Sequence, residues 1–187
     1  MVKQEKEKLI LGIDPGTNVM GYGLLSVKGN NLHFISMEVF TFNGKDHAIK
    51  LKKIFESTLQ LIDEHHPDEL AVEAPFFGKN IQSMLKLGRA QGVSMAAALY
   101  RNIPIFEYSP RKIKQAVTGK GNASKEQVAA MISTILKIKI SDKKLDATDA
   151  MAAALCHHFQ RDSEKISGTK FNGWKNFVES NPGKVVR

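Results

Sequence analysis

Three apolar runs joined by short links open the chain, and they constrain its fold more than any other feature. The first run covers residues 8–14 and is closed by Pro15-Gly16. Two more follow at 21–27 and 32–42, separated by the turn signal Lys28-Gly29-Asn30-Asn31. Apolar runs of this length, bounded by Gly, Pro and Asn, are typical of β-strands. They predict an antiparallel meander of three strands, the first of which is buried.

The period of the apolar residues changes after the third run. Between 48 and 62 they recur at helical spacing, which predicts an amphipathic helix ended by His65-His66-Pro67. Two more strands are predicted at 69–73 and 103–108. Further helices are expected from Asn80 to Arg101, from Ser109-Pro110 to Thr118, from Ser124 through Leu136 and from Lys144 to Phe159. The predicted order β-β-β-α-β-α-β-α-α-α is that of an α/β protein with a mixed five-stranded sheet flanked by helices.

A single domain accounts for most of the 187 residues. We expect it to cover residues 1–160. The apolar pattern fades after Gln160, where glycines and a Pro-Gly pair appear, so residues 161–187 are predicted to form a loosely ordered basic tail. His157 and His158, late on the last helix, are expected at the edge of the core or exposed, without a role.

Composition excludes several classes of protein. The one cysteine, Cys156, rules out an intrachain disulfide and a Cys-rich zinc site. No apolar run reaches the ~18 residues that a membrane-spanning helix needs. Residues 1–8 lack an apolar signal core. The sequence therefore predicts a cytoplasmic protein with no membrane partner.

The positive charge is concentrated in the middle of the chain. The net charge is −3 over residues 1–75, +9 over 76–140 and +2 over 141–187, so the middle segment supplies the whole net charge of +8. A one-sided excess of this size is typical of nucleic-acid binding. A solvated basic face without a partner is the alternative.

Four acidic residues occupy positions where a carboxylate needs a partner. Asp14 and Glu73 each close an apolar strand, and burying such a charge without compensation is costly. Asp146 and Asp149 lie three residues apart, on one face of an alanine-rich helix. Convergence of all four predicts a site for divalent cations with hard oxygen ligands, Mg²⁺ or Mn²⁺.

Two metals held in this way are a known device for phosphodiester cleavage, which then needs no general-base histidine. Each acid has a simpler interpretation as well. Asp146 could interact with the helix dipole, Asp149 could be an ordinary surface residue, and Glu73 could be a charge at a strand end.

Several motifs resemble the RuvC-type Holliday junction resolvases, in the right order over residues 9–160. They comprise Leu11-Gly12-Ile13-Asp14-Pro15-Gly16-Thr17 with Gly21-Tyr22-Gly23, Val72-Glu73 with Phe76, the segments 85–93 and 117–121, and Asp146-Ala147-Thr148-Asp149-Ala150. The first motif alone is weak, whereas the ordered set is highly specific.

The resemblance implies an RNase H-like fold and a homodimer whose two active sites nick opposite strands of a four-way DNA junction. It also implies a branch-migration helicase complex as a partner. The site residues that it implies are an acidic tetrad of Asp14, Glu73, Asp146 and Asp149 holding two metal ions, Lys114 and Lys125 near the scissile phosphate, and Phe76 as an aromatic that stacks at the junction. Pro75 departs from the commoner pattern beside Phe76, so Phe77 is the alternative stacking residue.

Gly88, Gly92 and Ala96 repeat every four residues and form a small-residue seam on one predicted helix. A seam of this kind lets another backbone approach closely. It could pack on the sheet of the same chain. The resemblance favours a two-fold dimer contact through it.

Three other functions compete with a junction resolvase. An actin-like or sugar-kinase-like ATPase also opens with a Gly-Ile-Asp-x-Gly-Thr turn, but the chain is short for two such domains and shows no second phosphate loop. A non-catalytic DNA-binding relative is disfavoured by the presence of all four acids. A related RNase H-like nuclease that acts on other branched or RNA-containing substrates is distinguished only by its substrates.

Overall fold

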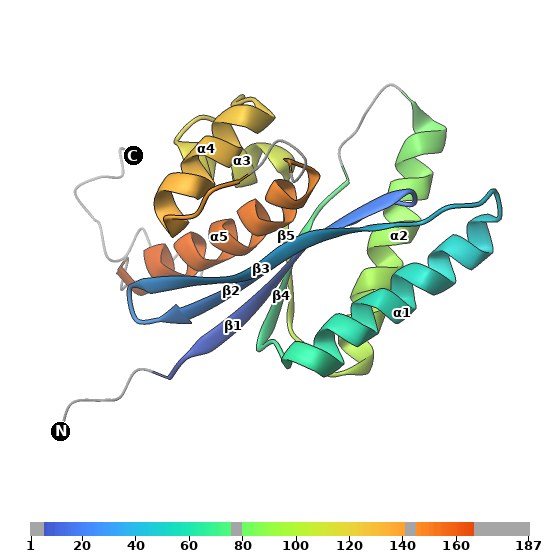
Figure 1. Ribbon diagram of the computed structural model, residues 1–187, viewed down its shortest axis with the longest axis horizontal. Coiled ribbons are helices and arrows are strands. Elements are labelled where there is room, and N and C mark those ends of the chain that lie inside the picture. Colours follow the sequence, from blue (N-terminus) through green and yellow to red (C-terminus); the bar gives the residue numbers. More distant parts are fainter. Residues whose placement is uncertain (1–5, 76–79, 141–144, 167–187) are drawn as a thin grey trace, which may run out of the picture.

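The computed structural model describes residues 6–75, 80–140 and 145–166, and it describes the backbone alone at 145–146 and 162–166. This part of the chain forms five strands and five helices (Figure 1). In chain order they are β1 (Lys8–Asp14), β2 (Val19–Lys28), β3 (Asn31–Thr41), α1 (His47–His65), β4 (Glu69–Glu73), α2 (Ile81–Tyr100), β5 (Ile105–Tyr108), α3 (Pro110–Thr118), α4 (Lys125–Leu136) and α5 (Leu145–Ile166). The predicted order of elements is confirmed.

The five strands form one mixed sheet in the order β3-β2-β1-β4-β5. β2 pairs antiparallel with both β1 and β3, which confirms the predicted meander. β4 pairs parallel with β1 and with β5. The carboxyl ends of β1, β4 and β5 therefore meet at one edge of the sheet.

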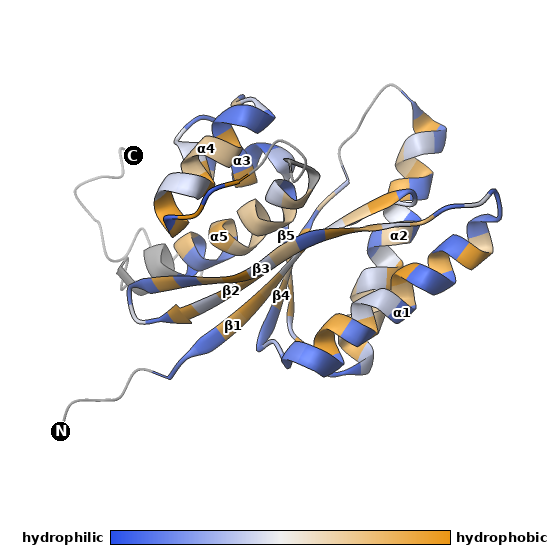
Figure 2. Cartoon of the chain, in the orientation of Figure 1, coloured by the Kyte–Doolittle hydropathy of each residue, from blue (hydrophilic) through white to orange (hydrophobic). Residues whose placement is uncertain are grey.

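Helices cover both faces of the sheet. Figure 1 shows α3, α4 and α5 on one face and α1 and α2 on the other. Each interface holds its own hydrophobic cluster, with Ile10, Ala71 and Leu155 in the first and Leu11, Leu70 and Ile54 in the second. In Figure 2 the hydrophobic colour follows the strands and the helix sides that face them. Alternate residues of β1 and β4 thus enter different clusters, as the two-residue period of a strand requires.

Two glycines allow α5 to lie close to the sheet. A Cβ atom at Gly12 would stand 2.0 Å from the carbonyl oxygen of Ala150, and one at Gly23 would stand 2.8 Å from the Cα of Met151. Both contacts involve the backbone of α5, so a flexible side chain cannot move aside to relieve them. This close contact fixes α5 across β1 and β2.

Local signals set the helix starts as predicted. The side chains of Asn80, Ser109 and Ser124 cap α2, α3 and α4. Ser124 forms a full capping box with Gln127.

The predicted end of the last helix is wrong, because α5 continues beyond Phe159 to Ile166. Residues 160–166 contain no glycine or proline that would stop it. The remainder of the predicted tail, 167–187, lies outside the described residues. Within the described part of the chain, no helix has both the length and the apolar character to cross a membrane.

Candidate active site

Asp14 and Glu73 lie next to each other at the sheet edge where the parallel strands end. They are the last residues of β1 and β4, and the residues before them, Ile13 and Val72, are partners in the parallel ladder. Gly12 packs against α5 two residues before Asp14. Because side chains alternate along a strand, Asp14 stands on the α5 face, as does Glu73 two residues after Ala71.

Helix α5 brings a third acid to the same place. Asp149 precedes Ala150, whose carbonyl faces Gly12 of β1. Its side chain is 16% exposed and its Oδ2 lies 2.8 Å from the Nζ of Lys125 at the start of α4. The interpretation of Asp149 as an ordinary surface residue is therefore wrong.

The electrostatics of Glu73 reflect the convergence of these acids. Burial, followed by the charges of Asp14 and Asp149, raises the pKa of Glu73 to about 8, and Lys125 and Lys114 lower it by smaller amounts. At neutral pH the carboxyl group of Glu73 is therefore largely protonated until a cation approaches. A strand-end charge in ordinary solvent would not behave in this way.

A cleft of about 280 Å³ opens beside Asp14 and Glu73. Its other walls come from Pro15, Ala74-Pro75, Leu87, Gln91 and Pro110. Gln91 is buried and its Nε2 donates to Glu107 Oε2 at 2.7 Å, which links α2 to β5 behind the cleft. The cleft thus has a rigid back wall and an acidic edge.

The donor set suits a hard divalent cation. Asp14 and Glu73 line the cleft, and carboxylate oxygens are the preferred ligands of Mg²⁺ and Mn²⁺. Among the side chains that the structure describes, no group of three or more Asp, Glu, His or Cys is gathered closely enough to bind a metal. Asp149 is instead paired with Lys125. Asp146 lies in the first turn of α5, with its side chain outside the described atoms. A complete metal site would therefore need Asp146 and the release of Asp149 from Lys125.

The structure places some of the other predicted site residues and leaves others outside the described part of the chain. Lys114 lies on α3 and contributes to the field at Glu73. Phe76 and its alternative Phe77 lie outside the described residues. Gly92 and Ala96 are exposed and Gly88 is half-exposed. A Cβ atom at Gly88 or Gly92 would meet nothing within 4 Å. The seam therefore does not pack on the sheet of its own chain.

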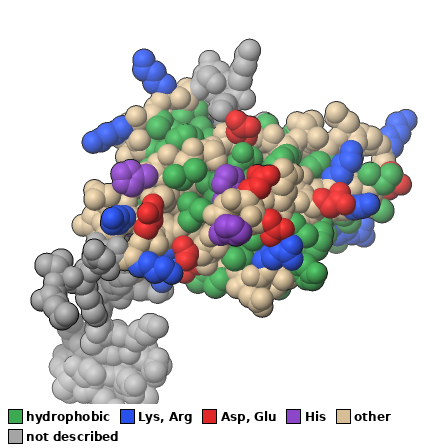
Figure 3. All heavy atoms as spheres, turned by 60° about the horizontal axis from the view of Figure 1, so that its bottom comes forward, with side chains coloured by type: hydrophobic (Ala, Val, Ile, Leu, Met, Phe, Trp, Pro, Cys, Tyr) green, Lys and Arg blue, Asp and Glu red, His purple; other side chains and the backbone are tan. Residues whose placement is uncertain are grey.

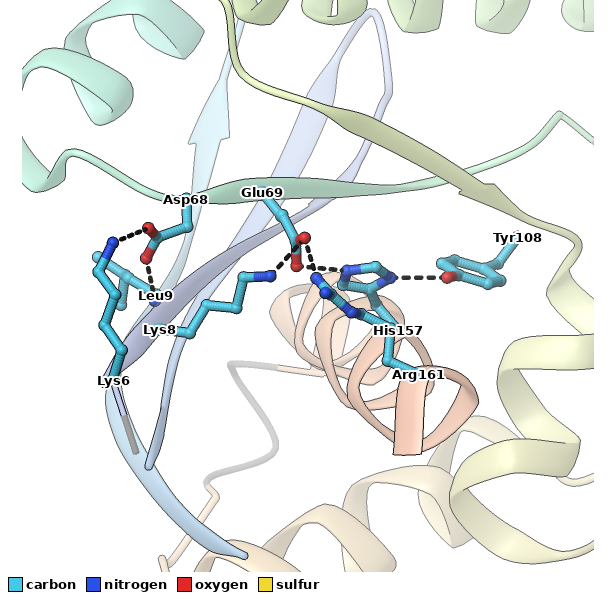
Figure 4. Close-up of polar contacts among 8 residues, drawn as sticks. All are labelled: Lys6, Lys8, Leu9, Asp68, Glu69, Tyr108, His157 and Arg161. Atoms are coloured by element: carbon cyan, nitrogen blue, oxygen red, sulfur yellow. Dashed lines mark hydrogen bonds and ion pairs between the residues drawn. The ribbon is translucent and has the colours of Figure 1, made fainter. Parts of the chain in front are cut away.

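A polar network (Lys8, Glu69, Tyr108, His157 and Arg161) centred on buried Glu69 and His157 was not predicted from the sequence (Figure 4). Glu69 Oε2 lies 2.8 Å from His157 Nε2, and the hydroxyl of Tyr108 lies 2.7 Å from His157 Nδ1. Lys8 and Arg161 form ion pairs with the other oxygen of Glu69. His157 is fully buried and His158 is buried as well, so neither histidine has the exposed position that the sequence allowed, and His157 does not lie at the edge of the core.

The network assigns a protonation state to His157. Burial lowers the pKa of His157 although Glu69 opposes this, and the ion pairs hold the pKa of Glu69 below its usual value despite its burial. A neutral ring satisfies both contacts, with Nε2–H donating to Glu69 and Nδ1 accepting from the Tyr108 hydroxyl. The sequence signal was Glu69 itself, a charged residue at the start of an apolar strand.

The network joins the elements that carry the candidate acids. Lys8 begins β1, which ends at Asp14, and Glu69 begins β4, which ends at Glu73. His157 and Arg161 follow Asp149 on α5. Figure 3 shows the end of the molecule where β4 begins, and there positive, negative and histidine side chains are interspersed. On the described part of this face the charge is thus of mixed sign.

Comparisons with known proteins agree with this arrangement. The family model described as crossover junction endodeoxyribonuclease RuvC matches residues 10–157. Proteins of that name from Cytophaga hutchinsonii and Christiangramia forsetii are 60% and 57% identical to the chain. These matches cover 96% and 97% of this chain and 88% and 94% of the relatives.

A solved structure supports the same assignment and the RNase H-like fold that the sequence resemblance implied. It is RuvC from Thermus thermophilus in complex with a Holliday junction substrate, 31% identical, with a TM-score of 0.78. The match covers 84% of this chain and 96% of that one. The actin-like ATPase interpretation is therefore excluded, and the chain belongs to the RuvC family of crossover junction endodeoxyribonucleases.

Proposed function

We propose that this chain resolves four-way DNA junctions with an active site built from Asp14, Glu73, Asp146 and Asp149. As a RuvC endodeoxyribonuclease it hydrolyses phosphodiester bonds of Holliday junction DNA. The observation that carries the assignment of residues is geometric: Asp14 and Glu73 end neighbouring parallel strands, and Asp149 lies on α5, which packs on Gly12. The mutual repulsion of these carboxylates favours a bound cation, whose site Asp146 would complete.

Membership of this nuclease family implies dependence on a divalent metal. We infer that the ions are two Mg²⁺, for which Mn²⁺ can substitute, because the cleft offers carboxylate oxygens and no sulfur. When bound, such a pair stabilises charge on the attacking and the leaving oxygen of the phosphodiester. Asp14 and Glu73 would hold these ions together with Asp146, and Asp149 would join them once it is released from Lys125.

Lys114 and Lys125 are proposed to neutralise charge that builds up on the phosphate in the transition state. Alanine at either position should lower the single-turnover cleavage rate more than it weakens junction binding, since the charge they meet is largest in the transition state. Quenched-flow cleavage and fluorescence anisotropy on one labelled junction measure the two effects. If both variants bind weakly but cut at the parental rate once saturated, the lysines are general phosphate contacts only.

We propose a two-fold dimer through the exposed face of α2, where the small-residue seam lies beside the exposed side chains of Leu85 and Leu99. Two-fold symmetry would place one active site on each of two opposite strands. A branch-migration helicase complex as partner rests on the family likeness alone.

Leucine at Gly92 is expected to separate the dimer, because the new side chain fills space that the partner backbone needs. Sedimentation velocity gives the mass, and Ala130→Leu, a small-to-large change at an exposed position of α4, is the matched control. A Gly92→Leu protein that folds normally and keeps the parental dimer mass would exclude the seam as the interface.

The substrate distinguishes a resolvase from a nuclease for other branched or RNA-containing molecules. Purified protein with Mg²⁺ should nick opposite strands of a synthetic four-way junction in preference to duplex, flap and RNA–DNA hybrid controls. Equal cleavage of flaps or hybrids would favour the alternative nuclease function.

A further inference from the structure

A second hollow, the basic pocket, lies beside the acidic cleft and has a volume of about 340 Å³. Thr17 and Asn18 reach it from the turn after β1, and Lys45 and Lys50 from just before α1 and from its first turn. Ser83 and Lys86 come from the first two turns of α2. Leu87 lines both the basic pocket and the cleft, so the two hollows share a wall. Thr17 also follows Asp14 by only three residues.

The basic pocket has an unbalanced charge. Three lysines line it, and none of the eight lining residues carries a carboxylate. The neighbouring acid in sequence, Asp46, caps α1 by accepting from the backbone amides of Ala48 and Ile49. The carboxylate of Asp46 thus faces the amino end of α1 and does not line the basic pocket. Three lysines in one hollow repel one another unless an anion lies between them.

The side chains of the pocket are partly oriented in advance. The Nζ of Lys50 donates to Asn18 Oδ1 at 2.6 Å, which ties α1 to the turn after β1. Hydroxyl donors from Thr17 and Ser83 complete a set made largely of donors. Apart from the imidazole of His47, no aromatic ring lines the pocket, so a stacked base has no platform there.

We propose that the basic pocket binds a backbone phosphate of the DNA strand being cut, one that neighbours the scissile phosphate. This inference rests on the proposed function, because the acidic cleft supplies the position of the scissile phosphate. The lysines act as point charges on a phosphate and read no base, so the contact contributes affinity and strand register rather than sequence preference. A small phosphorylated molecule offers the same chemistry, and the test separates the two sources.

The test compares Lys50→Gln and Lys86→Gln with Lys53→Gln, an exposed lysine of α1 that does not line the pocket. Junction affinity is measured by anisotropy between 50 and 200 mM salt (about the range over which phosphate contacts are screened). Each pocket variant should bind several-fold more weakly and should reduce the slope of log K against log salt by about one. Lys53→Gln should keep both parental values.

A second experiment identifies which backbone phosphate of the junction the basic pocket binds. Neutral methylphosphonates replace single phosphates, one position at a time, around the cut site of the labelled junction. One position should weaken binding by the wild-type protein and have little further effect on Lys86→Gln, because both changes remove the same contact.

The proposal is overturned if the pocket variants match Lys53→Gln, or if every methylphosphonate weakens wild type and Lys86→Gln equally, as expected for a pocket that holds a small phosphorylated molecule. Failure of the proposed function looks different, because the wild-type protein would then not cut junctions at all.

Discussion

Replacing Asp149 with asparagine is expected to lower the rate of junction cleavage on the order of a thousandfold, the scale for losing one electrostatic group of an active site. Asp14→Asn, Glu73→Gln and Asp146→Asn should have effects of similar size. Binding of the junction should stay largely intact, since phosphate contacts supply most of the affinity and removing negative charge does not weaken them. Single-turnover cleavage and anisotropy with the same junction measure the two quantities.

The control for these substitutions is Asp63→Asn, which removes an exposed carboxylate near the end of α1 that pairs with Arg101 at the end of α2. It should cut at the parental rate. Ca²⁺ should support binding without cleavage, because its longer and looser coordination spoils the geometry of the metals. An Asp149→Asn protein that still nicks junctions at nearly the parental rate would refute the assignment.

Glutamine at Glu69 is expected to cost about 3 kcal/mol of folding free energy, because it leaves Lys8 and Arg161 without their counter-charge at a buried position. This loss of folding free energy is at the lower end for a broken buried ion pair, since both cations are about a third exposed. Urea unfolding followed by circular dichroism measures the change. Glu56→Gln, which breaks the exposed pair with Lys52, should change stability by less than about 1 kcal/mol. Equal effects of the two substitutions would show that the network contributes little.

The network also predicts an acid-sensitive fold. Burial lowers the pKa of His157 in the folded state, so the unfolded chain takes up a proton first as the pH falls below about 6.5. Glu69, whose folded-state pKa is also lowered, acts in the same direction at lower pH. In a Glu73→Gln background, which removes the opposing effect of a carboxyl group whose folded-state pKa is raised to about 8, stability should therefore decline from about pH 6.5 downward. A midpoint of urea unfolding that stays constant between pH 7 and 5 would contradict this.

The approach of Asp14, Glu73 and Asp149 to one another could be predicted because its signals are local. Asp14 and Glu73 each end an apolar strand, and the parallel pairing of β1 with β4 brings strand ends together. The spacing of Asp146 and Asp149 on one alanine-rich helix indicated a face that packs close to the sheet. Gly12 and Gly23 are what allow α5 to approach the sheet so closely. The sequence does not show this, because it does not tell which helix packs on these two glycines.

The network and the basic pocket could not be predicted because their members are far apart in sequence. Glu69 meets His157 across 88 positions, and neither residue alone signals the other. Lys45 and Lys50 belong to the segment 1–75, whose net charge is negative. The net charge of the segments therefore did not indicate them as DNA contacts. Only the packing of α1 beside α2 brings them to Lys86.

The titration of the Glu73 carboxyl group tests the convergence of the acids most directly. Carbon-13 NMR of selectively labelled glutamate follows Glu73 and, as an internal control, Glu69. Without metal, Glu73 should titrate near pH 8 and Glu69 below its usual pKa of 4.5. Asparagine at Asp14 should lower the pKa of Glu73, and Mg²⁺ should ionise Glu73 at neutral pH, because a bound cation favours the carboxylate. If Glu73 titrates near pH 4.5, and if neither the Asp14 substitution nor Mg²⁺ shifts its pKa, the acids do not converge on one site.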